Sequence, residues 1–151
     1  MRRLFIVLSR SADGVWYLPL FLCPFLIDTT LALPCFTAAV IAFAIERPLY
    51  RIGKHTFKRT RPCNHLLIAP LLPPPDEFSF PSGHSSGAFT ALTVFAGFFP
   101  VTYVPLMIWA IGVAISRVYS SVHYPLDVVV GALLGTCCGK LALYFAHTLI
   151  Y

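Results

Sequence analysis

Charged side chains are scarce in this sequence. Asp, Glu, Lys and Arg together make up 11% of its 151 residues, whereas a soluble domain carries about 25%. Hydrophobic residues account for 58%, and the mean hydropathy is +0.78. These residues stand in long unbroken runs rather than at the period of an amphipathic helix or strand. The composition excludes an ordinary soluble domain and is typical of an integral membrane protein.

Acidic side chains are the rarer charged type. Six Asp and Glu residues face eleven Lys and Arg residues, which gives a formal net charge of +5. No nucleic-acid partner is expected, because a protein with so much apolar surface has no obvious soluble face to offer one. We assign the excess positive charge to contacts with lipid headgroups and with an anionic substrate.

Cysteine spacing also excludes several classes of protein. The five cysteines mostly lie inside apolar runs, two of them are adjacent, and no Cys-x-x-Cys spacing occurs. The pattern resembles neither a disulfide framework nor a metal site, so we interpret the cysteines as small apolar packing residues. Neither a metal nor another cofactor is expected. The cysteines are Cys23, Cys35, Cys63, Cys137 and Cys138.

The apolar runs predict an all-α integral membrane bundle of about five spanning helices, in a single domain that covers residues 1–151. The N-terminal segment MRRLFIVLSR has an apolar core too short for a secretory signal, and we expect it to lie at the membrane interface. The expected spans lie near Gly14–Ile27, Leu31–Ile45, Ser85–Phe99, Val101–Ser120 and Pro125–Tyr151.

A polar region separates the second and third expected spans. Four of its basic residues recur at intervals that place them on one face of a continuing helix. They are Arg47, Arg51, Lys54 and Lys58. Pro62 is expected to end that helix, and the proline-rich stretch after it predicts an irregular loop at the interface. We interpret four basic residues here as headgroup anchors, namely Arg47, Arg51, Lys58 and Arg59.

The polar residues that could bind an anion or take part in catalysis fall into three groups that border the expected spans. The first group follows the second span, the second precedes the third span, and the third lies between the fourth and fifth spans. If successive spans cross the membrane in alternating directions, all three groups lie at the same end of the bundle. The groups are Lys54 with Arg61–Pro62; Pro81–His84; and Ser116–Arg117 with His123 and Asp127.

The types of these residues indicate an anion site. Lys54 and Arg61 are seven positions apart, about two helical turns, so both can face one point, and Arg117 adds a third cation. Three cations at a membrane boundary need a compensating anion, and too few acids are nearby to neutralise them all. A phosphate would serve, since guanidinium groups bind its oxygens bidentately. Ser82 and Gly83 would add the N-terminus of a helix.

Two histidines add the capacity for covalent chemistry. His123 and Asp127 are four positions apart, one helical turn, so the carboxylate can accept a hydrogen bond from one ring nitrogen. The other nitrogen is then free as a nucleophile. His84, from another helix, can protonate a leaving oxygen. Arg117 would bind an anion, His123 would attack it, and Asp127 would orient the His123 ring.

The three groups together resemble the three-part signature of the type 2 phosphatidic acid phosphatase superfamily. That superfamily also holds glucose-6-phosphatase-like enzymes and vanadium haloperoxidases. The matching residues are Lys54, six residues, Arg61–Pro62; then Pro81-Ser82-Gly83-His84; then Ser116-Arg117, five residues, His123, three residues, Asp127. All three parts match in order and spacing, and they extend over about half of the chain.

The resemblance implies a metal-independent phosphatase on an all-helical bundle. It implies that His123 is the nucleophile that forms a phosphohistidine, that Asp127 orients it, and that His84 is the general acid and later the base that activates water. It implies a phosphate-binding role for five residues: Lys54, Arg61, Ser82, Gly83 and Arg117.

We therefore expect a lipid phosphatase of the cell membrane, and the short loops favour the inner membrane of a bacterium. The candidate substrates are phosphatidic acid, phosphatidylglycerol phosphate, undecaprenyl diphosphate and a lipid A phosphate. Three alternatives remain open: a lipid phosphotransferase with the same site, a vanadate-dependent peroxidase, and a non-enzymatic anion-binding membrane protein. Long apolar runs disfavour the peroxidase, because the superfamily's haloperoxidases are soluble.

Overall fold

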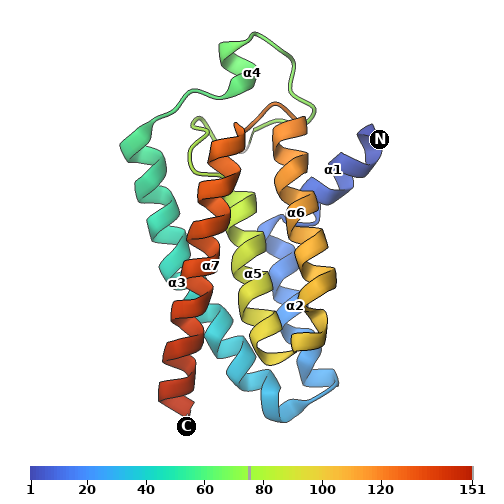
Figure 1. The fold of residues 1–151 in the computed structure, drawn as a ribbon, viewed down its shortest axis with the longest axis vertical. Helices are drawn as coiled ribbons and strands as arrows, with labels where there is room; N and C mark the ends of the chain where they lie inside the picture. Colours follow the sequence, from blue (N-terminus) through green and yellow to red (C-terminus); the bar gives the residue numbers. More distant parts are fainter. Residues whose placement is uncertain (75, 151) are drawn as a thin grey trace.

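The computed structural model describes residues 1–74 and 76–150, and this part of the chain is a bundle of helices (Figure 1). The prediction of an all-α bundle is confirmed. Thr60 and Phe78 form an isolated antiparallel bridge. The elements in chain order are α1 (Arg2–Arg10), η1 (Gly14–Trp16), α2 (Tyr17–Leu22), η2 (Cys23–Leu26), α3 (Thr29–Phe57), α4 (Pro62–His65), α5 (Gly83–Phe98), η3 (Pro100–Thr102), α6 (Tyr103–Tyr119) and α7 (Pro125–Ile150).

Helix α3 runs the length of the bundle. It begins after Asp28, whose side chain accepts a hydrogen bond from the Thr30 backbone N–H at 2.9 Å and so satisfies one of the free donors of the first turn. It ends at Phe57, because Lys58 turns into the left-handed region with φ 44°. The expectation that Pro62 ends the helix is therefore wrong. Pro62 instead occupies the first position of α4, where proline fits without loss of a hydrogen bond.

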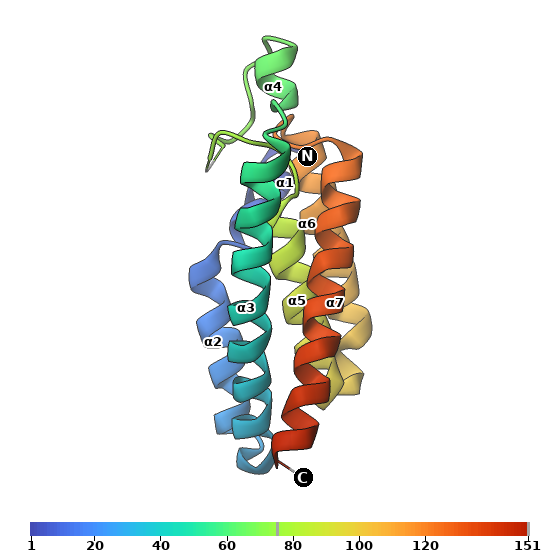
Figure 2. The same cartoon turned by 90° about the vertical axis from the view of Figure 1, so that its left-hand side faces the viewer.

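Helix α5 lies in the middle of the bundle, beside α3, α6 and α7 (Figures 1 and 2). Its closest neighbour is α7, which it contacts along most of its length. Small residues allow this approach, because Ala38 and Ala42 of α3, Ala91 of α5 and Ala142 of α7 are all fully buried in one core cluster. The helix axes therefore pack closely with few large side chains between them.

Among the described residues, three helical segments are long and apolar enough to cross a membrane: Thr29–Phe57, Pro100–Tyr119 and Pro125–Thr148. A fourth is obtained if Arg2–Arg10 and Gly14–Leu26, which meet at a 61° bend, are counted as one broken span. Helix α5 has 16 residues and falls short of a span by itself. The expected five spans thus correspond to three or four by length and composition. Tyr151, the last residue of the fifth expected span, lies outside the described residues.

The loops that carry the polar residues gather at one end of the bundle. Helix α4 and the long connection from α3 to α5 cover this end, while the C-terminus lies at the opposite end (Figures 1 and 2). Helices α3 and α6 finish there, and α7 begins there. Helix α1 is tilted beside α6 near the same end, where Phe5 stacks on Tyr119 with ring centroids 4.1 Å apart. An interfacial position for α1 stays a prediction.

Candidate functional site

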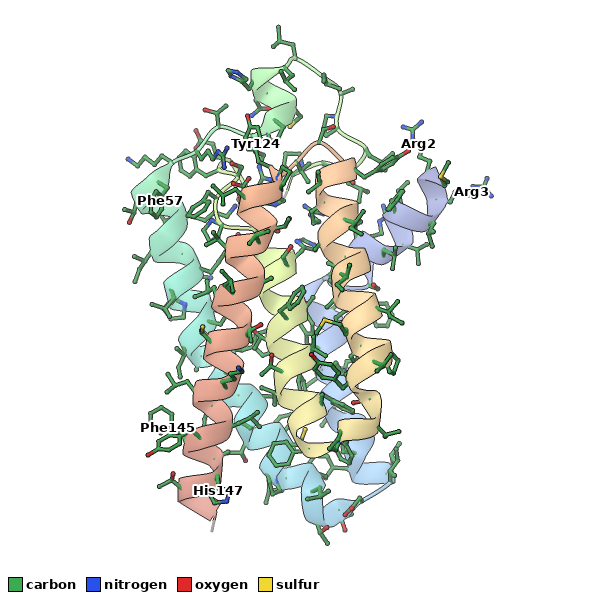
Figure 3. All side chains as sticks on the ribbon, in the orientation of Figure 1. Arg2, Arg3, Phe57, Tyr124, Phe145 and His147 are labelled. Carbon is green, nitrogen blue, oxygen red and sulfur yellow. The ribbon has the colours of Figure 1, made fainter. Side chains whose placement is uncertain are left out.

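The predicted site residues come from five elements that meet at the loop-covered end of the bundle. Figure 3 labels Phe57, the last residue of α3, and Tyr124, the residue before α7, at this end. Lys54 lies in the last turn of α3, and Arg61 immediately precedes α4. The remaining six begin α5, end α6, or begin α7 and the link before it: Ser82, Gly83, His84, Arg117, His123 and Asp127.

Lys54 and Arg61 converge on one carboxylate. The Asp76 Oδ1 atom accepts from Lys54 Nζ at 2.6 Å and from Arg61 Nη2 at 2.5 Å, and Oδ2 accepts from the Tyr50 hydroxyl at 2.7 Å. Lys54 Nζ also donates to the Phe78 carbonyl oxygen. Lys54 and Arg61 face one point because the chain reverses after α3, and not because they share a helical face as the sequence spacing suggested.

The hydrogen bonds of His123 fix the position of its ring proton. Nδ1 lies 2.7 Å from the Ser79 carbonyl oxygen, which can only accept, so Nδ1 carries the hydrogen. On the other side of the ring, Arg61 Nη1 lies 3.4 Å from Nε2, and a guanidinium can only donate. Both neighbours therefore require the same tautomer. The lone pair is on Nε2, and it faces the cationic group.

The surroundings of His123 keep its ring neutral. Burial lowers the pKa of His123 to about 4, and the charges of Arg117, Arg61 and Lys54 act in the same direction against the opposing effect of Asp127. At neutral pH the ring is therefore uncharged and retains its Nε2 lone pair. This is the protonation state that a nucleophilic histidine requires.

Asp127 forms its hydrogen bonds with residues other than His123, the partner that the sequence suggested. Its Oδ2 lies 3.7 Å from His123 Nδ1, longer than a hydrogen bond, and accepts from the Tyr124 backbone N–H at 2.8 Å. Its Oδ1 pairs with Arg59 Nη1 at 2.7 Å. The Arg59 guanidinium also stacks over the Tyr124 ring at 4.0 Å. The interpretation of Arg59 as a headgroup anchor is therefore wrong, because this residue is bound to Asp127.

The start of α5 is tied to the start of α7. Ser82 precedes the helix as its N-cap and accepts from the Ser85 backbone N–H at 3.4 Å. The Ser82 backbone N–H donates to the Asp127 carbonyl oxygen at 2.9 Å. A Cβ atom on Gly83 would lie 2.7 Å from the Tyr50 ring, so glycine is needed here for close packing against α3.

The N-terminal segment contributes two polar groups that sequence reasoning missed. His84 Nε2 lies 2.9 Å from Asp13 Oδ1, and the His84 side chain is 17% exposed. Arg117 Nη1 donates to the Ser9 hydroxyl, and both residues are buried. These bonds attach the segment before α2 to the starts and ends of helices that lie far away in the chain.

Arg117 is the most poorly satisfied group at this end of the bundle. The residue is 2% exposed, and within residues 1–74 and 76–150 its Nε and Nη2 atoms have no hydrogen-bond partner. Its charge acts on the rings of both His84 and His123. Two guanidinium nitrogens therefore lie unpaired and buried, and the charge that they carry reaches both histidines.

Several of the residues that complete this end carry no signal in the sequence. Asp76, Ser79 and Asp13 belong to irregular segments, where no helical period predicts which way a side chain points. Arg59 stands among other basic residues and looks like them. Within the described residues no group of three or more His, Cys, Asp or Glu side chains lies together as a possible metal site.

Fold and site together define a class: an all-helical bundle with membrane-crossing helices and a buried cationic site containing two histidines. The family model described as PAP2 superfamily matches residues 29–151, and the chain belongs to that superfamily. Helix α1 and Asp13 lie outside the matched residues. The chain is an integral membrane protein, as its likeness to a solved transmembrane phosphatase also indicates.

Several of the relatives that the chain resembles are phosphatases by name. The chain is 37% identical over 120 residues to undecaprenyl-diphosphatase of Sulfolobus acidocaldarius, covering 72% of this chain and 54% of that protein. It is 35% identical over 108 residues to phosphatidylglycerophosphatase B of Bacillus subtilis, covering 64% and 50%. The chain therefore spans about half the length of the curated relatives it matches.

Two solved structures share the fold. The crystal structure of Aquifex aeolicus LpxE aligns with a TM-score of 0.79 at 28% identity, covering 95% of this chain and 85% of that one. The Bacillus subtilis transmembrane PAP2-type phosphatidylglycerolphosphate phosphatase aligns with a TM-score of 0.77 at 26% identity, covering 97% and 77%. The recognition of the superfamily from the three polar groups is confirmed.

Proposed function

We propose that the protein is a metal-independent lipid phosphatase that hydrolyses a phosphomonoester or diphosphate bond. The observation that carries the proposal is Arg117, a buried guanidinium with two nitrogen atoms that have no partner in the described part of the chain. Burying a cation without an anion is costly. A phosphoryl group supplies two oxygens in the geometry that a guanidinium binds best.

The first half of the proposed reaction transfers the phosphoryl group to His123. Lys54, Arg61 and Arg117 bind its oxygens, with the N-terminus of α5 at Ser82 and Gly83 as a further anion-binding element. The Nε2 lone pair of His123 attacks phosphorus, and the bond from phosphorus to the lipid oxygen breaks. Burial and the charge of Arg117 lower the pKa of His84 to about 4, and the negative charge of a bound phosphate opposes this shift, so that His84 can deliver a proton to the leaving oxygen. Asp127, fixed by Arg59, supplies negative charge beside the ring as it becomes cationic.

The second half returns the enzyme to its starting state. Water attacks the phosphohistidine, His84 accepts a proton from that water, and phosphate leaves as the bond to Nε2 breaks. If a bound hydroxyl acceptor takes the place of water, the same residues make a lipid phosphotransferase. Hydrolysis in 18O-labelled water distinguishes the two, because only hydrolysis places label in the released phosphate.

The substrate class follows from where the site lies. Lys54 and Arg61 are in the last turn of α3 and just beyond it, next to long apolar helices whose outer side chains are exposed, so a lipid can place its headgroup here and its chains in the bilayer. The names of the relatives support three candidates, namely undecaprenyl diphosphate, phosphatidylglycerol phosphate and a lipid A phosphate. Phosphatidic acid is the fourth, from the resemblance of the three polar groups to the superfamily signature. We place the protein in the cell membrane, and specifically in an inner membrane where two exist.

Phosphate release from these four lipids in detergent micelles tests the proposal. Wild type is expected to release phosphate from at least one of them, with or without EDTA. Arg117→Ala is expected to reduce kcat/KM by about 100-fold, because one set of charge-assisted donors to the transition state is lost. Arg51→Ala is the matched control, since Arg51 is exposed on α3, and it should retain full activity.

Two results would contradict this assignment. If folded wild type releases no phosphate from any of the four lipids yet binds inorganic phosphate, the chain is an anion-binding membrane protein and not a phosphatase. If Arg117→Ala and Arg51→Ala lose activity equally, Arg117 has no special part in it. Circular dichroism and size-exclusion profiles establish that each variant is folded before its activity is compared.

The pH dependence of phosphoenzyme formation should report His123. The protonated ring has no lone pair on Nε2, so the reaction requires the neutral form. Because the pKa of His123 is lowered to about 4, the rate should persist through pH 5 and fall as pH drops through about 4. An acid limb centred near the ordinary histidine pKa of about 6.5 would contradict this environment. Rapid-quench measurement with a diphosphate lipid provides the test, because its leaving group is a phosphate that departs without a proton from His84, whose pKa is also lowered to about 4.

A further inference from the structure

Asp76 is the partner of two cations to which we assign the substrate phosphate. Its carboxylate accepts from Lys54, Arg61 and Tyr50, with one oxygen shared by the two cations. The three donors come from α3 and from the residue before α4, so they are held by helices rather than by the loop that carries Asp76. A carboxylate oxygen here takes the contacts that a phosphoryl oxygen would take.

The exposed fractions of the side chains show that Asp76 covers Lys54 and Arg61. The side chains of Lys54 and Arg61 are 6% and 0% exposed, whereas that of Asp76 is 34% exposed. Asp76 therefore lies on the outer side of both cations. An incoming phosphate that binds the two cations must meet this carboxylate first, and it must share the cations with it or replace it.

Asp76 is ionised at neutral pH. Burial opposes the charged form, but hydrogen bonds from Lys54 and Tyr50 and the charges of Lys54 and Arg61 outweigh it and lower the pKa of Asp76 below its ordinary value. Lys54 and Arg61 therefore share one fixed negative charge, and the same charge acts on Arg117 without direct contact. A ligand that replaces the carboxylate gains only if it brings more charge than the carboxylate does.

We propose that Asp76 competes with the substrate for Lys54 and Arg61, and that this competition makes the site select doubly charged terminal phosphates. The inference rests on the proposed function of the site. A phosphomonoester carries up to two negative charges and exchanges favourably with a carboxylate. The phosphodiester of an ordinary phospholipid carries one, so it exchanges one charge for another and gains nothing. Asp76 thus keeps bulk membrane lipids out of the site.

Asp76→Asn tests the competition, because it removes the charge and keeps the shape. The matched control is Glu77→Gln, the same change of charge one position away on the same loop, at an exposed residue. Binding of inorganic phosphate to detergent-purified protein is measured by calorimetry. Asp76→Asn should bind phosphate at least about tenfold more tightly than wild type, and Glu77→Gln should match wild type.

The selectivity is measured with phosphatidylglycerol, a singly charged phosphodiester, added to the phosphate-release assay in mixed micelles. It should inhibit Asp76→Asn competitively and leave wild type and Glu77→Gln unaffected at the same mole fraction. Asp76→Ala, a second variant that removes all three acceptor contacts, should also gain affinity for phosphate. Thermal melts establish that each variant is folded.

The inference is overturned if Asp76→Asn and Asp76→Ala bind phosphate no more tightly than wild type, since Asp76 would then position the cations and not compete for them. It is also overturned if both variants still reject phosphatidylglycerol. Phosphate binding needs no turnover, so a chain that binds phosphate as expected but hydrolyses no lipid phosphate would refute the proposed function and leave the competition by Asp76 in place.

Discussion

Replacing His123 by alanine is expected to abolish phosphate release, with kcat reduced by at least about three orders of magnitude. The reason lies in the hydrogen bonds around the ring. The Ser79 carbonyl oxygen takes the Nδ1 hydrogen, and the Arg61 guanidinium faces the Nε2 lone pair. No other buried imidazole in the described part of the chain has its free nitrogen directed at the same cations.

Phosphate binding should persist in the His123→Ala variant even though phosphate release is lost. The cations that bind the phosphate belong to other elements, and Arg61 also donates to the Val122 carbonyl oxygen at 2.8 Å. It therefore keeps a fixed position without His123. Inorganic phosphate should bind the His123→Ala variant within a fewfold of wild type. A loss of both binding and activity would indicate misfolding, which a thermal melt detects.

The covalent intermediate gives a direct measurement. Wild type quenched during turnover of a 32P-labelled lipid should carry label as an acid-labile, base-stable phosphoramidate, and His123→Ala should carry none. His65→Ala is the control, since His65 is an exposed residue of α4 at the same end of the bundle, and it should label and turn over normally. Rapid turnover by His123→Ala would rule out this residue as the nucleophile.

The sequence predicted the parts of the fold that depend on helical periodicity and on apolar length. The starts of α5 and α7 near Ser82 and Pro125 follow from a capping serine and from a proline at the first helical position. Given these helix ends, alternation of the helices is enough to gather the polar groups at one end of the bundle. Little of this depends on side-chain detail.

The partners of the site residues depend on loop paths, which no period encodes. The left-handed turn at Lys58 ends α3 early and sends Arg59 toward Asp127, whereas the spacing alone suggested a longer helix with an exposed arginine. Likewise, the Ser79 carbonyl oxygen takes the ring hydrogen that the sequence assigned to Asp127. A backbone carbonyl has no residue type, so no sequence pattern could have identified it.

The second large effect is expected at the contact between α5 and α7. A Cβ atom built on Gly135 would lie 2.1 Å from the Ser86 carbonyl oxygen and 2.9 Å from the Thr90 backbone nitrogen. Both neighbours are backbone atoms of α5, so neither can turn aside as a side chain would. Gly135→Ala must therefore push α5 and α7 apart along their longest contact.

This displacement reaches the site because both helices begin there. The Ser82 backbone N–H donates to the Asp127 carbonyl oxygen across the two helix starts, and separation of the helices weakens that bond. His84 then moves with α5, while Asp127 moves with α7. We expect Gly135→Ala to reduce kcat strongly, although Gly135 itself lies more than two helical turns away from Asp127 along α7.

Thermal stability separates packing from helix propensity. Alanine is a better helix former than glycine by about 1 kcal/mol, so propensity alone would raise Tm. Overpacking of this kind costs about 1–3 kcal/mol, and the clash with backbone puts Gly135→Ala at the upper end. We expect Tm to fall by about 3–8 °C.

Gly14→Ala is the control, since a Cβ atom there has no neighbour within 4 Å, and it should leave Tm and activity unchanged. An unchanged or raised Tm in Gly135→Ala would mean that α5 and α7 do not pack this closely, and the link between their starts and the site would then be lost as well.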